Sequence, residues 1–142
     1  MKKGIFMLAF ATGAAFTTQA QKLDAAKVPV AVKSAFTKMY PDITAKWEME
    51  KGEFEAGFKQ NGKDMSVLFT KEGTMTESEV DIAVSELPAA VTQYVKAHYK
   101  GAAIKEAAKI TKADGTVTYE AEVNKTDLIF DEKGAFQKEV KD

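Results

Sequence analysis

Apolar residues recur every three or four positions in two stretches of the chain, the spacing typical of a helix that covers one face of a larger structure. The first stretch lies in residues 28–41 and the second in residues 87–101. Each has a proline at its second position, where a helix does not need the missing N–H. The pattern predicts two amphipathic helices, ended by Pro41 and Gly101.

After each helix the pattern changes to an alternation with period two, which a half-buried β-strand requires. Apolar Ile43, Ala45, Trp47 and Met49 alternate with polar residues, and Asn61-Gly62 is a strong hairpin signal. Four strands are expected after each helix. This order predicts an α+β fold in which both helices pack on one face of antiparallel sheet. It leaves open whether the eight strands form one sheet or two.

The two sets of elements are also similar in sequence. The segment VPVAV at residues 28–32 recurs as LPAAV at 87–91, EFEA at 53–56 recurs as TYEA at 118–121, and VLF at 67–69 recurs as LIF at 128–130. The offset between copies changes only where turns are expected, and turns tolerate insertions. The sequence therefore predicts two tandem repeats, each a helix plus a four-stranded antiparallel sheet, at about residues 28–82 and 87–140.

Residues 1–20 have the lysines, the apolar stretch and the small residues of a secretory signal peptide. Residues 21–142 then have the length of one ordinary domain. No later segment approaches the roughly 20 apolar residues of a membrane span. We therefore expect an exported protein, periplasmic or secreted, with no membrane insertion after the signal is removed.

Composition excludes several kinds of chemistry. The chain has no cysteine, so disulfides, thiol catalysis and cysteine metal sites are excluded. His98 is the only histidine and cannot by itself supply a catalytic set. No basic residue is an arginine, so nucleic acid is not an expected partner. The composition indicates a binding protein and not an enzyme.

Acidic residues gather on one predicted face. Glu77, Glu79 and Asp81 alternate along the fourth strand and should share the face opposite the helices. Acids of the neighbouring strands that begin the first set should share this face: Glu48, Glu50, Glu53 and Glu55. We expect this face to be solvated. A calcium site at Glu77, Glu79 and Asp81 is the alternative, since hard cations take carboxylate oxygens, although the chain has no EF-hand loop.

Two apolar residues are expected on that same outer face. If their neighbours pack against the helices, then Leu68 and Ile129 point outward at matching positions of the two repeats. Single exposed apolar residues are common on any surface. The alternative is an apolar centre with a polar rim, the usual composition of a protein interface, in which Glu48 and Glu50 belong to the rim.

Several short motifs along the chain are shared with one known family: Val28-Pro29, Tyr40-Pro41, Trp47-Glu48, Phe54-Glu55-Ala56, Leu68-Phe69, Gly73, Leu87-Pro88, Tyr99, Tyr119-Glu120 and Ile129-Phe130. Through these residues the chain resembles the PepSY-like, β-lactamase-inhibitor-like proteins exported by Bacteroidetes, over about residues 28–138. The resemblance implies a tandem repeat of a helix against an antiparallel sheet, similar to the β-lactamase inhibitory protein. It also implies a role in binding or inhibiting another protein, and some members are linked to calcium. No catalytic residues come with the family, and no inhibitory loop or target is carried over, because that inhibitor has disulfides which this chain cannot form.

These observations predict an exported, non-enzymatic binding protein that uses its open sheet face to bind or inhibit another periplasmic protein. The sequence does not identify this partner. The alternative is a calcium-binding or small-ligand-binding sensor or structural protein of the periplasm. No other cofactor is expected.

Overall fold

The computed structural model describes residues 21–141, and the predicted signal peptide therefore lies outside the described residues. These residues form two α-helices, two short 3₁₀ helices and one nine-stranded antiparallel sheet. The helices are η1 (Ala25–Lys27), α1 (Val30–Met39), η2 (Val84–Glu86) and α2 (Ala89–His98). The strands are β1 (Gln21–Leu23), β2 (Lys46–Glu50), β3 (Glu53–Gln60), β4 (Lys63–Phe69), β5 (Met75–Ile82), β6 (Glu106–Lys112), β7 (Val117–Val123), β8 (Thr126–Asp131) and β9 (Phe136–Lys141).

The strands lie in the sheet in the order in which they occur along the chain, from β1 to β9. The predicted α+β class is therefore confirmed, and the strands of both halves belong to a single sheet, with β5 paired to β6 at its middle. The sequence did not predict β1, which pairs its three residues with β2. A strand this short has too few positions to show an alternating pattern.

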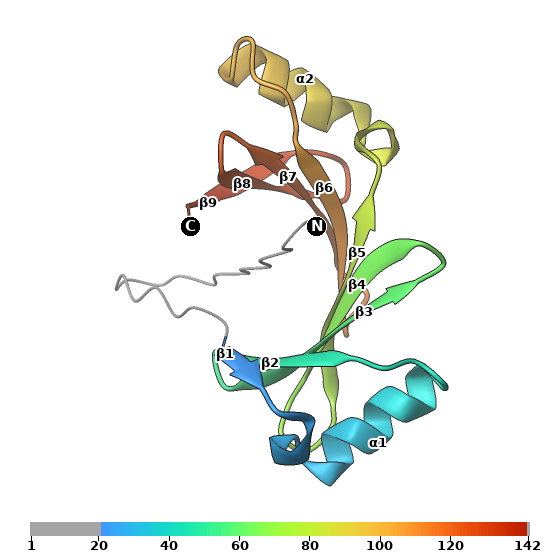
Figure 1. Cartoon of the computed structure of the whole chain (residues 1–142). Helices are drawn as coiled ribbons and strands as arrows, with labels where there is room; N and C mark the ends of the chain where they lie inside the picture. Colours follow the sequence, from blue (N-terminus) through green and yellow to red (C-terminus); the bar gives the residue numbers. More distant parts are fainter. Residues whose placement is uncertain (1–20, 142) are drawn as a thin grey trace.

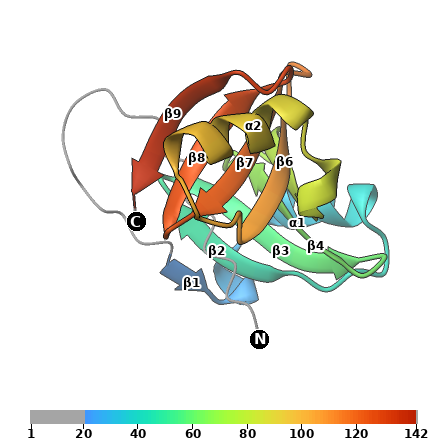
Figure 2. The same ribbon diagram turned by 90° about the horizontal axis from the view of Figure 1, so that it is seen from above.

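The sheet is strongly curved, and the two α-helices lie outside the curve at opposite ends of the molecule (Figure 1). When the molecule is turned by 90° and seen from above, α2 lies across the strands of the C-terminal half, β6–β9 (Figure 2). Within residues 21–141 no helix is long and apolar enough to cross a bilayer. The face of the sheet that turns away from the helices is concave, and we call it the concave face.

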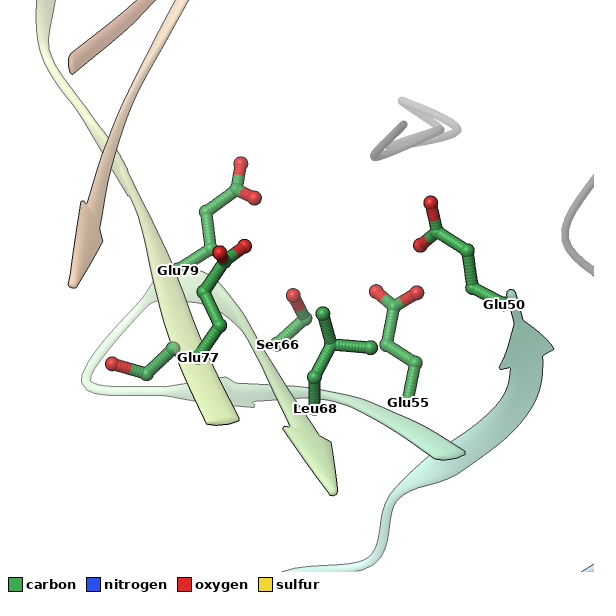
Figure 3. Close-up of a pocket in the computed structure, with 7 residues that line it drawn as sticks. Glu50, Glu55, Ser66, Leu68, Glu77 and Glu79 are labelled. Atoms are coloured by element: carbon green, nitrogen blue, oxygen red, sulfur yellow. The ribbon is translucent and has the colours of Figure 1, made fainter. Parts of the chain in front are cut away.

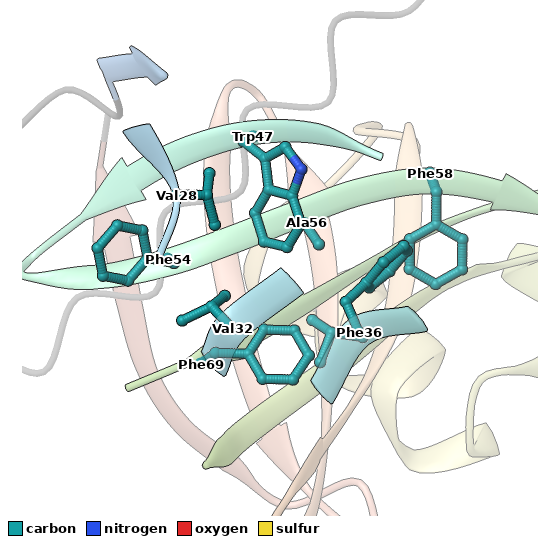
Figure 4. Close-up of a cluster of buried hydrophobic side chains, with 9 residues drawn as sticks. Val28, Val32, Phe36, Trp47, Phe54, Ala56, Phe58 and Phe69 are labelled. Atoms are coloured by element: carbon teal, nitrogen blue, oxygen red, sulfur yellow. The ribbon is translucent and has the colours of Figure 1, made fainter. Parts of the chain in front are cut away.

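The first hydrophobic core lies between α1 and strands β2–β4 (Figure 4). Val32 and Phe36 of the helix are buried, and they meet Val67 and Phe69 of the sheet. Trp47 belongs to this core, as the alternating pattern predicts, with its ring edge-on to Phe36 at a centroid distance of 5.5 Å. The helix begins at Val30, later than predicted, because residues before Pro29 are extended or belong to η1.

A second core of the same kind lies under α2. Val91 and Val95 are buried against Leu128 and Phe130 of β8. Tyr94 stacks on Phe136 at a centroid distance of 4.6 Å. The two cores contain different residues, and the sheet joins them.

A glycine turn fits closely against the start of each α-helix. Gly73, between β4 and β5, has a φ of +86°, and a Cβ atom added there would lie 2.6 Å from the carbonyl oxygen of Ala31. Gly134, between β8 and β9, has a φ of +84° and the same relation to Ala90, at 2.9 Å from its Cβ. Only glycine combines this backbone conformation with so close an approach.

Candidate binding site on the concave face

Strand pairing brings the acidic residues of the first half together. In an antiparallel ladder, directly paired residues have side chains on the same face. Glu55 of β3 pairs with Leu68 of β4, which in turn pairs with Glu77 of β5. The neighbouring row joins Ser66 to Glu79. The prediction that these acids and Leu68 share the face opposite the helices is thus confirmed.

These residues surround a small pocket. Figure 3 shows Glu50, Glu55, Glu77 and Glu79 projecting to the same side, with Ser66 and Leu68 between them. The interior accommodates about one water-sized group. The pocket is lined by Glu50, Glu55, Ser66, Leu68, Glu77, Ser78 and Glu79.

The expectation of a solvated acidic face is wrong. Glu50, Glu55, Glu77 and Glu79 are buried, with exposed fractions of only 5–8%. The reason is the curvature of the sheet, because side chains that project into a concave face crowd together and exclude water. Alternation along a strand shows which face a residue occupies, but not how the face curves.

Burial changes the protonation of two pocket residues. Burial raises the pKa of Glu55 from 4.5 to about 7, with further increases from the charges of Glu50 and Glu48. A hydrogen bond with Ser66 opposes this increase, whereas a carboxyl–carboxyl hydrogen bond with Glu50 adds to it. Burial likewise raises the pKa of Glu77 to about 7, although the ammonium group of Lys112 lowers it. Close to neutral pH, both carboxyl groups are therefore partly protonated.

Glu79 is the least exposed of the pocket acids. Its exposed fraction is 5%, and its Oε1 atom has no hydrogen-bond partner. Burial raises its pKa well above 4.5, and the carboxyl groups of Glu120, Glu55, Glu77 and Asp81 raise it further. A carboxyl group in such surroundings favours the protonated form unless a cation compensates its charge.

The calcium candidates do not converge as a set. Glu77 and Glu79 line the pocket, whereas Asp81 is not among the lining residues. In the part of the chain that the structure describes, no three Asp, Glu or His side chains are grouped closely enough to hold a metal ion. Calcium binding at these residues stays a prediction.

The two apolar candidates lie on the concave face, but neither is fully exposed. Leu68 is half-buried in the pocket wall, and Ile129 is buried with an exposed fraction of 5%. Ile129 pairs with Glu120 on one side and Lys138 on the other. The expectation of outward exposure is therefore wrong for Ile129, for the same reason that it is wrong for the acids. Of the two predicted rim residues, Glu48 is half-exposed and Glu50 is buried.

The sequence did not single out Ser66 or Glu120 as site residues. Ser66 lines the pocket, and Glu120 has the largest effect of the charged groups that raise the pKa of Glu79. Glu120 matches Glu55 in the recurring segments TYEA and EFEA, so the similarity of these segments could have pointed to Glu120. His98 lies away from the pocket at the end of α2, is exposed, and stacks on Tyr94.

Comparison with known proteins identifies the family. A sequence profile described as "Putative beta-lactamase-inhibitor-like, PepSY-like" matches residues 14–77 and 52–138, which together span most of the chain. The chain belongs to this PepSY-like family. The resemblance predicted from the sequence is thus confirmed. Among curated proteins, none matches the chain.

Solved structures show the same fold. A Bacteroides eggerthii protein described as "putative periplasmic" is 24% identical and has a TM-score of 0.73, over 80% of this chain and 88% of that chain. A DUF2874 family protein from Bacteroides uniformis is 22% identical, with a TM-score of 0.71 over 79% and 88% of the two chains. A BLIP-like protein from Bacteroides fragilis is 24% identical, with a TM-score of 0.59 over 78% and 83%. The PepSY-like chain shares the architecture of all three.

Proposed function

We propose that this PepSY-like chain is an exported, non-enzymatic periplasmic protein that binds, and by binding inhibits, another protein through its concave face. The observation that carries the proposal is the composition of that face. Half-buried Leu68 offers apolar contact there, buried Ile110 and Ile129 lie on the same face behind the surface, and carboxyl groups lie around them. An apolar centre with a polar surround is typical of protein interfaces.

Both α-helices pack on the opposite face, so neither covers the concave one. Leu68 lies in the wall of the pocket and is half-buried, so a partner contacts it with a protruding segment, because a flat surface contacts only the rim of a concave face. The description of the eggerthii neighbour as periplasmic agrees with the predicted periplasmic location. The family description as inhibitor-like supports a binding role.

We also infer that the single domain consists of two copies of one unit. Each α-helix follows a proline in the N-cap position, Pro29 or Pro88. The strand register shifts after Leu68 in the first half and after Ile129 in the second. Glu77 pairs with Leu68, and Lys138 pairs with Ile129, so Glu77 and Lys138 occupy equivalent positions in the two halves. Irregularities at matching positions are expected of duplicated units.

A comparative capture experiment tests the proposed interface. The purified protein and its Leu68→Lys variant are immobilised and exposed to periplasmic extract, and the captured proteins are identified by mass spectrometry. Met39→Lys is the matched control, because it adds the same charge at an exposed site of α1, outside the concave face. A partner captured by the wild type and the control, but lost with Leu68→Lys, is the expected result. Equal capture by all three proteins contradicts binding through the concave face.

A calcium-binding or small-ligand-binding sensor is the second candidate function. The presence of Glu77 and Glu79 in one pocket favours it. A calcium titration of thermal unfolding, described below, separates this function from protein binding.

A further inference from the structure

Glu79 lies at the point where the two halves of the sheet join. It is on β5, pairing with Ser66 on one side and with Ile110 of β6 on the other. Only 5% of Glu79 is exposed. Figure 3 shows its side chain projecting into the pocket, with Glu77 beside it. The Oε1 atom has no hydrogen-bond partner. An unsatisfied buried carboxyl oxygen is costly to the fold and calls for an explanation.

Lysines of the described residues act on Glu77, whereas the strongest charges near Glu79 are acidic. Lys112 and Lys51 both lower the pKa of Glu77, which shows that their ammonium groups act on its carboxyl group. The charged groups that act most strongly on Glu79 come from β3, β5 and β7, and all of them are carboxyl groups: Glu55, Glu77, Asp81 and Glu120. Among residues 21–141, no ion pair within 4.0 Å joins Glu79 to a lysine. Glu79 therefore has an acceptor oxygen in the pocket with which no lysine of residues 21–141 forms an ion pair.

The fold itself does not require an acid at this position. If the two halves are copies, the position of Glu79 corresponds to Val140, because these residues lie two positions beyond Glu77 and Lys138 on β5 and β9. Val140 is buried on the same face with an exposed fraction of 9%. An apolar residue thus fills the matching position of the same fold. A role in ligand binding explains the acid of the first half better than a structural role.

The size and lining of the pocket limit the kind of cation. Room for about one water-sized group fits a primary ammonium, whereas the planar guanidinium of arginine is larger. A divalent metal ion needs several converging oxygen ligands, and no three acidic or histidine side chains of residues 21–141 converge in that way. An ammonium group has three N–H donors, and Glu79 and Ser66 offer oxygen acceptors. Leu68 offers apolar contact for an alkyl stem.

We propose that the pocket formed by Glu55, Ser66, Leu68, Glu77 and Glu79 binds a primary ammonium group on an alkyl stem, namely the lysine side chain of the protein partner. The inference rests on the proposed function and specifies the chemistry by which the partner is recognised. A lysine side chain is also narrow enough to enter the concave face, which a flat protein surface cannot do. Its ammonium group compensates the carboxylate of Glu79, and its methylene groups pack on Leu68.

The proposal is tested first without any protein partner. Butylammonium chloride reproduces the end of a lysine side chain, and its binding is followed by NMR shifts of the pocket residues at pH 8. Saturable binding is expected in the millimolar range, since one small group contributes little affinity. 1-Butanol, its neutral counterpart, and sodium chloride at equal concentration should not reproduce the shifts. Absence of saturable binding, or equal binding of 1-butanol, overturns the proposal.

Two further measurements locate the site. Glu79→Gln should weaken butylammonium binding by about tenfold or more, because it removes the compensating charge. Glu106→Gln, which changes an exposed acid paired with Glu122 on the same face, should leave it unchanged. Binding to the wild type should weaken as the pH falls from 8 to 5.5, since Glu55 and Glu77, whose pKa values lie at about 7, take up protons in this range. Equal binding of butylammonium by both variants overturns the assignment. If Glu79→Gln folds poorly, the wild type still decides, because binding that does not depend on pH also overturns the assignment.

A competition experiment separates this proposal from the proposed function. Butylammonium chloride, but not 1-butanol, should release the partner captured through the concave face. If a partner is captured there but butylammonium does not bind, the proposed function stands and the ammonium site is refuted. If butylammonium binds but does not release the partner, the lysine source is refuted, and the pocket accepts a free alkylamine.

Discussion

Replacing Glu55 by Gln should stabilise the protein at pH 8 and leave its stability unchanged at pH 4. The pKa of Glu55 rises from 4.5 to about 7 on folding, so the folded protein holds this proton more tightly than the unfolded chain does. The stabilisation is complete below about pH 4.5 and is lost as the pH rises through about 7. Above that pH the buried carboxylate therefore destabilises the fold.

The size of this effect follows from the change in pKa. A pKa shift of Glu55 from 4.5 to about 7 lowers the free energy of unfolding of the wild type by about 3 kcal/mol at pH 8, relative to a group that stays neutral. For a domain of this length, recovering that energy raises the melting temperature by roughly 10 °C. Gln keeps the shape of the protonated acid and can hydrogen-bond to both Ser66 and Glu50, so no new buried group is left unsatisfied.

Urea denaturation at pH 4 and pH 8 measures the difference directly. Trp47 is the only tryptophan and is buried in the first core, so its fluorescence reports unfolding. Glu106→Gln is the control, because it removes an exposed acid from the same face. If Glu55→Gln is no more stable than the wild type at pH 8, or if it gains equally at pH 4, then burial of Glu55 does not govern its protonation and the reasoning fails.

Three further predictions concern the turns, the concave face and calcium. Gly73→Ala should cost about 2–4 kcal/mol of unfolding free energy, because the new Cβ meets the backbone of Ala31, whereas Gly115→Ala, with a similar φ of +87° and open space, should cost only about 1 kcal/mol. Equal losses, measured by urea denaturation, would show that the contact with α1 is unimportant. Leu68→Lys should lower the melting temperature by only a few degrees while it abolishes partner capture, since Leu68 is half-buried, and a loss of fold would place it in the core instead. If the protein binds calcium with a micromolar dissociation constant, calcium at about 100 times that value should stabilise the fold by about 2.7 kcal/mol. An unchanged melting curve at this or a higher calcium concentration would end the calcium hypothesis.

The sequence was sufficient to predict the elements and their faces, but not the shape that they form. The helical stripes ending at Pro41 and Gly101 correspond to α1 and α2, and Asn61-Gly62 forms the hairpin between β3 and β4. The period of two placed Leu68 and Ile129 on the face opposite the helices. Each of these features depends on residues close together in the chain, which a single sequence records directly.

The burial of the site depends on curvature, which a single sequence does not record. Curvature results from the summed twist of many strands and from register shifts such as the one between Leu68 and Phe69. The alternating pattern therefore predicted correctly which face of the sheet Glu79 occupies, but it predicted wrongly that Glu79 is exposed to solvent. The pocket also needs Ser66, a small polar residue without distinctive spacing, which strand pairing brings beside Glu79.

The strictly sequential order of the sheet has a consequence for how the chain folds. Every strand pairs only with the strands before and after it, and the longest connection, between β5 and β6, contains η2 and α2. No strand has to pair with one that is distant in the strand order, so the contact order is lower than in a sheet with crossover connections, and folding should be fast for its class. The ladder can also grow from one end, one hairpin at a time. Strands β2–β5 with α1 can pair before the rest of the chain is available, and α2 and β6–β9 then extend an existing edge at β5.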